Sequence, residues 1–149
     1  MKLIKSVLMA AGVLTVTSSR ADLIVSQSFS GGTLPAGTPS GTSFYGTFSD
    51  AGAGDQVLGI SVGLNISGGY NGVLYSYLVA PNGTLVTLLD QPGFNYLGNV
   101  FGASGAGMNI TLQDGTTDHG SIQNETSTEY LTGSYNPATT LGTFNNSSA

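Results

Sequence analysis

The sequence lacks cysteine and has very little charge. No cysteine occurs among its 149 residues, so neither disulfide bonds nor thiolate metal sites can supplement a hydrophobic core. Charged residues make up 7% of the chain, so small neutral polar groups must cover the surface in place of salt bridges. The fold therefore depends on packing and on backbone hydrogen bonds.

Positive charge is confined to the start of the chain. The three basic residues are Lys2, Lys5 and Arg20, and all eight acidic residues follow them. The chain after Arg20 has no lysine or arginine. Such a surface cannot neutralise phosphates and release their counterions, which is the main source of non-specific affinity for nucleic acids. We therefore expect no nucleic-acid partner and little affinity for anionic membrane surfaces.

The N-terminus has the pattern of a secretory signal peptide. Lys2 and Lys5 form a basic n-region, residues 6–16 form an apolar h-region, and residues 19–21 form a small-x-small cleavage site. The apolar stretch is shorter than the roughly 20 residues that span a bilayer, although a stretch of this length could also be a core element. We expect cleavage near Ala21 and a mature protein that is secreted or held at the cell surface.

Glycine is abundant, and the apolar residues alternate. The chain has 23 glycines, a composition that suits turns and strands better than helices. Residues 60–66 alternate apolar and small polar side chains, which is the period of a half-buried strand. Residues 74–79 and 84–89 are further strand candidates, joined by a Pro-Asn-Gly turn signal. We expect these three runs to form a meander whose last two strands make a hairpin.

Weaker strand signals flank this central region. Residues 23–29 predict an opening strand, followed by a loop rich in glycine, proline and threonine through Gly41. Residues 99–101 and 108–112 predict further strands, and polar residues dominate 113–129. Because the mature part shows no helical period, the sequence predicts one all-β domain, an antiparallel β-sandwich of jelly-roll type.

Three short motifs carry a family resemblance. Residues 70–74 read Tyr-Asn-Gly-Val-Leu, residues 78–84 read Leu-Val-Ala-Pro-Asn-Gly-Thr with a Leu-Leu pair after them, and residues 133–137 read Gly-Ser-Tyr-Asn-Pro. In this order they resemble the Tyr-x-Gly-Asp-Leu, Leu-x-Ser-Pro-x-Gly-Thr and Gly-x-Tyr-x-Pro motifs of the P domain (P/Homo B domain). That domain is the β-sandwich that follows the catalytic domain of subtilisin-like proprotein convertases. The resemblance covers residues 58–145.

A second form of the same module is also similar. In P-domain-like modules of exported bacterial proteins with a C-terminal PEP-CTERM sorting signal, a Gly-Gly-Tyr-Asn-Gly stretch precedes a Leu-Tyr-x-Tyr-Leu strand, and residues 68–78 match that pattern. The resemblance implies a galactose-binding-like sandwich over residues 56–149, after a signal peptide at 1–21 and an N-terminal strand and loop at 22–55. Val73 stands where the family has aspartate, so any structural role of that carboxylate, such as bracing a loop or holding a cation, is absent here.

The resemblance also implies an incomplete sandwich. The family continues beyond the region of Phe144 into an Asn-Gly-x-Trp strand and one more strand, whereas this chain ends at Ala149. We therefore expect the last strands of the sandwich to be missing. An unpaired sheet edge and an exposed apolar face would follow, and both favour aggregation.

The residues offer little evidence of catalysis. His119 is the single histidine and follows Asp118, but the sequence has no Gly-x-Ser-x-Gly elbow to supply a nucleophile. A histidine in a polar stretch is typical of a solvated loop. Asp114 and Asp118 lack the apolar surroundings that would raise the pKa of one carboxyl for acid catalysis. We expect a protein that is not an enzyme.

Acidic residues in glycine-rich loops are the candidate metal ligands. Loop carbonyls could complete a calcium shell of six to eight oxygens around carboxylates in such loops. No EF-hand spacing is present. The candidate calcium ligands are Asp50, Asp55, Asp114 and Asp118.

Tyrosines suggest a third kind of binding. A tyrosine ring offers an apolar plate and a hydroxyl to a sugar, although tyrosines at strand spacing are also typical of core edges. The candidates are Tyr70, Tyr75, Tyr77, Tyr96, Tyr130 and Tyr135. We expect a non-catalytic structural or binding module of an exported bacterial protein, with a protein or polysaccharide partner outside the cell. The alternatives are an accessory domain of a subtilisin-like serine endopeptidase and a carbohydrate-binding surface module.

Overall fold

The computed structural model describes the backbone of residues 4–8, 12–18, 21–35, 41–48, 56–80 and 82–144. Within these ranges the regular structure consists of strands and short 3-10 helices, which confirms the predicted all-β class. The strands are β1 (Ile4–Leu8), β2 (Gly12–Ser18), β3 (Ala21–Gln27), β4 (Tyr45–Phe48), β5 (Gln56–Ser67), β6 (Tyr75–Val79), β7 (Leu85–Asp90), β8 (Gly107–Gln113) and β9 (Leu131–Tyr135). The 3-10 helices are η1 (Asn71–Val73), η2 (Tyr96–Gly98), η3 (Ile122–Asn124) and η4 (Leu141–Phe144).

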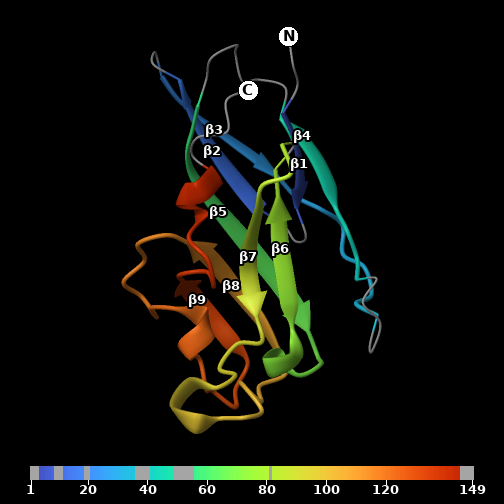
Figure 1. The fold of residues 1–149 in the computed structure, drawn as a ribbon. Coiled ribbons are helices and arrows are strands. Elements are labelled where there is room, and N and C mark those ends of the chain that lie inside the picture. The colour runs from blue at the N-terminus through green and yellow to red at the C-terminus, as the bar shows by residue number, and fades with distance from the viewer. Residues whose placement is uncertain are drawn as a thin grey trace.

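The strands form two sheets (Figure 1). One sheet has the order β4-β1-β6-β7 and the other has the order β3-β2-β5-β8-β9. The pairs are antiparallel except for β8 and β9, which run parallel. The expectation of antiparallel pairing throughout is therefore wrong at this edge. Parallel neighbours need a long crossover, and residues 114–130 supply it between β8 and β9.

A single hydrophobic core joins the two sheets. Val62 and Leu64 of β5 are buried, at alternate positions as the sequence predicts. They belong to one cluster that also includes Val86 and Leu88 of β7 and side chains of β6, β8 and β9. The period of two thus buries one face of β5 against strands of the other sheet. This shared core fixes the positions of the loops at both ends of the strands.

The predicted hairpin is confirmed, but the predicted meander is wrong. Strands β6 and β7 pair antiparallel, from Tyr75 opposite Asp90 to Val79 opposite Leu85. Gly83, with φ of +86°, closes the turn between them. Strand β5 instead pairs with β2 and β8 in the other sheet, because the chain crosses between sheets after β5 through η1. An apolar period identifies a strand but not its neighbour.

Of the three weaker strand predictions that flank the central region, two are confirmed and one is wrong. The opening strand predicted at 23–29 corresponds to β3, and the strand predicted at 108–112 corresponds to β8. The strand predicted at 99–101 is wrong, because these residues follow η2 in an irregular loop. There the Asn99 side chain accepts hydrogen bonds from the N–H groups of Phe101 and Gly102. A side chain that bonds its own backbone competes with a sheet ladder.

The N-terminal segment forms strands within the described chain. Strand β1 pairs with β4 and β6, and β2 lies between β3 and β5. Cleavage near Ala21 is a processing event and stays a prediction. Separately, no helix in the described ranges is long and apolar enough to cross a membrane.

Candidate functional site

Asp114 holds the start of η4. Its Oδ1 accepts a hydrogen bond from the Leu141 N–H at 2.8 Å, and its Oδ2 accepts one from the Gly142 N–H at 2.7 Å. The first N–H groups of a helix have no partner within the helix, and a carboxylate is a favourable acceptor for them. Asp114 therefore ties the loop after β8 to the buried Leu141.

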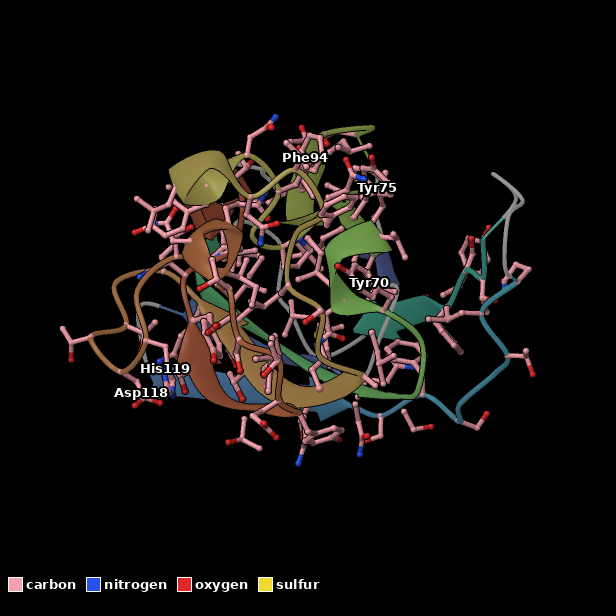
Figure 2. The ribbon with its side chains drawn as sticks, turned by 90° about the horizontal axis from the view of Figure 1, so that it is seen from below. Tyr70, Tyr75, Phe94, Asp118 and His119 are labelled. Carbon is pink, nitrogen blue, oxygen red and sulfur yellow. The ribbon has the colours of Figure 1, made fainter. Side chains whose placement is uncertain are left out.

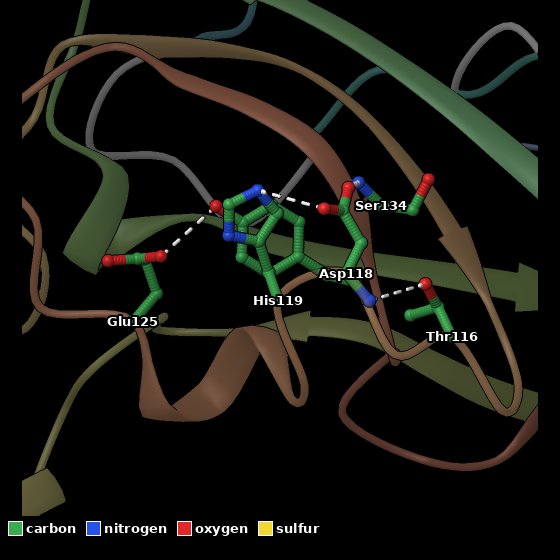
Figure 3. A network of polar contacts seen from close by, with 6 residues as sticks. Thr116, Asp118, His119, Glu125 and Ser134 are labelled. Atoms are coloured by element: carbon green, nitrogen blue, oxygen red, sulfur yellow. Dashed lines mark hydrogen bonds and ion pairs between the residues drawn. The ribbon is translucent and has the colours of Figure 1, made fainter.

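Asp118 and His119 tie the same loop to β9 (Figure 3). The Ser134 N–H donates to Asp118 Oδ2 at 2.8 Å, and the His119 N–H donates to the Ser134 carbonyl at 3.2 Å. The Asp118 N–H also donates to Thr116 Oγ1 at 3.3 Å. Both backbone groups of one β9 residue are thus occupied by this short loop. Asp118 acts here as a structural brace.

The His119 ring packs on a buried tyrosine. The imidazole stacks on the Tyr135 ring with centroids 4.6 Å apart and an interplanar angle of 14°. The Tyr135 hydroxyl donates to Glu125 Oε2 at 3.1 Å, and burial, together with the Glu125 carboxylate, raises the pKa of Tyr135. We call Asp118, His119, Glu125 and Tyr135 the His119 network.

The geometry of the His119 network favours bracing over catalysis. His119 Nε2 lies 3.7 Å from Asp118 Oδ1, and these side chains are 44% and 54% exposed. The hydrogen bond between His119 and Ser134 joins two backbones, whereas a hydrolytic triad would join the imidazole to a serine Oγ. The exposed loop position of His119 agrees with the sequence prediction. Its stacking on Tyr135, sixteen positions later in the sequence, had no sequence signal.

The predicted calcium ligands divide into two groups. Asp50 and Asp55 lie outside the described residues. Asp114 and Asp118 each accept backbone N–H groups from a different segment. Among the residues that the structure describes, no three side chains of histidine, cysteine, aspartate or glutamate gather into a possible metal site. A calcium site built from all four aspartates stays a prediction.

The six candidate tyrosines do not share one face. Tyr135 is buried in the core at 2% exposure, as an alternative interpretation of these residues allows. Tyr75 and Tyr130 are about half exposed. In the view from below, Tyr70 and Tyr75 lie on the same side as Phe94, while Asp118 and His119 lie at the opposite margin (Figure 2). The predicted tyrosine platform is therefore not assembled as a whole.

The most unusual surface is a loop that the sequence analysis assigned in part to a strand. We call residues 91–102, between β7 and β8, the tip loop; it lies at the lower end of the molecule (Figure 1). Its four exposed apolar side chains are Phe94 at 40%, Leu97 at 87%, Val100 at 59% and Phe101 at 74% exposure. Large exposed apolar groups gathered on one short loop are uncommon on a protein that has no partner for them.

The neighbouring elements extend this apolar surface. Val73 of η1 and Tyr75 of β6 are 58% and 50% exposed. The Gln91 N–H donates to the Leu74 carbonyl, which places the start of the tip loop beside them, and Figure 2 shows Tyr75 on the same side as Phe94 of the loop. A charge-free run from Gln91 to Gln113 was the sequence signal that could have indicated this surface.

The base of the tip loop is firmly anchored. Asn71 is fully buried; its Nδ2 donates to the Gly107 carbonyl and its Oδ1 accepts from the Gly107 N–H, both at 3.0 Å. The Gly72 N–H donates to the Ala103 carbonyl, and the Ala103 N–H donates to Pro92. These bonds connect η1 to both ends of the tip loop. The loop therefore projects from a fixed base.

Comparisons with protein-family models, with curated proteins and with solved structures found no match to this chain.

Proposed function

We propose that this protein is a non-catalytic binding module that acts outside the cytoplasm and uses its tip loop to contact its partner. The observation that carries the proposal is the exposure of Phe94, Leu97, Val100 and Phe101 on a loop with a fixed base. Their burial against a partner would remove apolar surface from water, which is the dominant favourable term in most association.

The polar side chains support the non-catalytic part of the proposal. Asp114 and Asp118 accept backbone N–H groups of η4 and β9, and Glu125 accepts from the Tyr135 hydroxyl and the Ser127 N–H. A carboxylate used in this way stabilises the fold around the 114–130 crossover. The same groups are the ones that would be needed for acid and base chemistry.

Two sequence features support the location and the kind of module. The basic and apolar N-terminus has the pattern of a signal peptide. The motifs at residues 70–74, 78–84 and 133–137 resemble those of P-domain-like modules in exported bacterial proteins. Of these segments, residues 70–74 include η1, whose bonds to Ala103 and Gly107 hold the base of the tip loop.

The proposal is tested by following the chain in a bacterial culture that exports it. We expect the wild-type protein to fractionate with the cell envelope or extracellular material, and the double substitution L97S/F101S to release it into the medium. Leu85→Ser is the matched control, because Leu85 is 53% exposed at the far end of β7. Equal distribution of the wild type and both variants would contradict the use of the tip loop for binding.

A further inference from the structure

Several backbone groups of the tip loop are paired within the loop itself. The Phe94 N–H donates to the Gln91 carbonyl, and the Asn95 and Asn99 N–H groups donate to carbonyls of the same loop. Asn99 also donates from its side chain to the Gly102 carbonyl. In hydrocarbon an unpaired backbone group is very costly, whereas a hydrated protein interface can pair such groups with trapped water.

The backbone at the apex of the tip loop, residues 95–100, includes two non-glycine residues in a left-handed conformation. Asn95 and Leu97 have φ of +61° and +49°, a left-handed conformation that leucine rarely adopts. Leu97 is nevertheless the most exposed of the large hydrophobic residues described, at 87%. Backbone conformations of this kind are concentrated at functional sites, where the surrounding structure maintains them.

The charge distribution narrows the choice of partner. Residues 91–113 contain no charged side chain, and the whole chain has a net charge of −5. Moving an ionised group from water into an apolar phase is very costly, so a loop that enters such a phase must carry no charge. An acidic protein would also be repelled by an anionic surface. A neutral apolar phase fits both features.

The side chains at the apex favour lipid over sugar. The side chains of Leu97 and Val100 offer no hydrogen-bond donor or acceptor, and the side-chain amide of Asn99 is bonded within the loop. Sugar sites need polar groups that converge on hydroxyls. Tyr75 lies beside the loop at 50% exposure, and a ring with a hydroxyl suits the boundary between headgroups and hydrocarbon.

We propose that the tip loop inserts Leu97, Val100 and Phe101 into the surface of a membrane made of neutral, zwitterionic lipids. This inference rests on the proposed binding function and names the partner of the same site. The contact is shallow: the loop enters the boundary between headgroups and hydrocarbon while the sheets stay in water. Because the attraction is apolar, it is expected to change little with salt concentration.

The absence of cysteine permits a local test. We would place a single cysteine at Leu97→Cys or, as the control, at Leu85→Cys, and attach an environment-sensitive fluorophore to each. With phosphatidylcholine vesicles we expect a blue shift from the label at position 97 and no shift from the label at position 85. Circular dichroism of both labelled chains confirms that they fold as the wild type does.

Vesicle pelleting provides the second measurement. We expect L97S/F101S to bind phosphatidylcholine vesicles at least about tenfold more weakly than the wild type, because two large apolar side chains no longer enter the membrane. The Leu85→Ser control should bind as the wild type does. Phosphatidylglycerol vesicles should bind no more strongly than phosphatidylcholine vesicles.

Several outcomes would overturn the lipid proposal. They are a blue shift at both labelled positions, a shift that needs phosphatidylglycerol, a shift caused by raising the protein concentration without lipid, and a shift caused by polysaccharide alone. A complete lack of response to vesicles would overturn it as well. If L97S/F101S still releases the chain from cells in that case, the binding function stands and only the choice of lipid is wrong.

Discussion

At the scale of single residues, aspartate side chains hold the 114–130 crossover, which contains no strand of its own. Asp114 and Asp118 each accept backbone N–H groups from segments sixteen or more positions away. Such bonds contribute modest free energy individually, but each satisfies groups that would otherwise have no partner in the fold. The loop between β8 and β9 is held in this way by side chains.

Asp114 provides a direct test of this bracing. We expect Asp114→Ala to lower the free energy of unfolding by about 1–2 kcal/mol, because two N–H groups at the start of η4 lose a charged acceptor. Asp114→Asn retains one side-chain acceptor and should lose about half as much. Urea denaturation measures both values. Equal stability of the alanine variant and the wild type would contradict a bracing role.

Tyr135 predicts a loss of stability at high pH. Burial first and the nearby Glu125 second raise its pKa, so the folded state favours the protonated phenol. The stabilisation is fully present below the unfolded pKa of about 10 and is lost as the pH rises from there through the folded pKa. We expect the free energy of unfolding to fall by up to about 1.4 kcal/mol per pH unit above pH 10.

Phenylalanine substitutions separate this effect from general alkaline unfolding. Tyr135→Phe should remove the contribution of this residue to the pH slope, whereas Tyr75→Phe, at a half-exposed position on β6, should leave it in place. Urea denaturation from pH 8 to pH 11 measures the slope for each variant. The account fails at this residue if both variants show the wild-type slope.

At the scale of elements, the irregular segments are packed as closely as the strands. Gly93, near the start of the tip loop, has φ of +77°, and a Cβ there would overlap the Glu125 carbonyl oxygen and lie 3.0 Å from the Ala103 nitrogen. Gly83 in the β6–β7 turn has φ of +86° with open space around it. The two glycines share a conformation and differ in their surroundings.

This difference predicts unequal effects of the same substitution. Both Gly93→Ala and Gly83→Ala incur the left-handed penalty of roughly 1–2 kcal/mol. Gly93→Ala must also displace backbone around the base of the tip loop, so we expect it to cost about 3 kcal/mol or more in total. Thermal unfolding of the two variants makes the comparison. Equal midpoints would mean that the close approach at Gly93 is not important.

The elements also show what sequence patterns can predict. The alternation at residues 60–66 and the turn after Val79 were sufficient to predict β5 and the β6–β7 hairpin. They could not show that β5 belongs to the other sheet, because pairing depends on contacts far away in the chain. At residues 99–101 the apolar run suggested a strand, but the Asn99 side chain bonds its own loop instead.

The candidate site was less predictable than the fold. The sequence identified Asp114, Asp118 and His119, but their partners lie on β9 and η4, and no local spacing reveals such contacts. The tip loop was missed because apolar residues are ordinarily assigned to a core. Their exposure results from the hydrogen bonds of η1 and the loop itself, which only the assembled fold brings together.

At the scale of the whole molecule, two sheets with a shared core carry an apolar loop at one end. The buried Asn71, and the bond of the Gly93 N–H to the Gln123 carbonyl, hold that loop in position, so the binding that we propose would require little ordering of the chain. Pre-organisation of this kind raises affinity because less conformational freedom is lost on binding.

Cleavage of the N-terminal segment would also change the fold. In the described chain β2 pairs with β3 on one side and β5 on the other. Cleavage near Ala21 would remove both β1 and β2, while β5 would keep β8 as its neighbour and its buried Val62 and Leu64. If the chain is cleaved there, as we propose, the exported form would differ from the precursor in sheet composition as well as in length.

The most direct test of the central claim is the intact mass and N-terminal sequence of the chain recovered from a bacterium that expresses it. Our account predicts a protein outside the cytoplasm that begins at Asp22, after removal of residues 1–21. A folded chain that retains its N-terminus and stays in the cytoplasm would contradict an exported binding module. It would instead identify β1 and β2 as permanent strands of the two sheets.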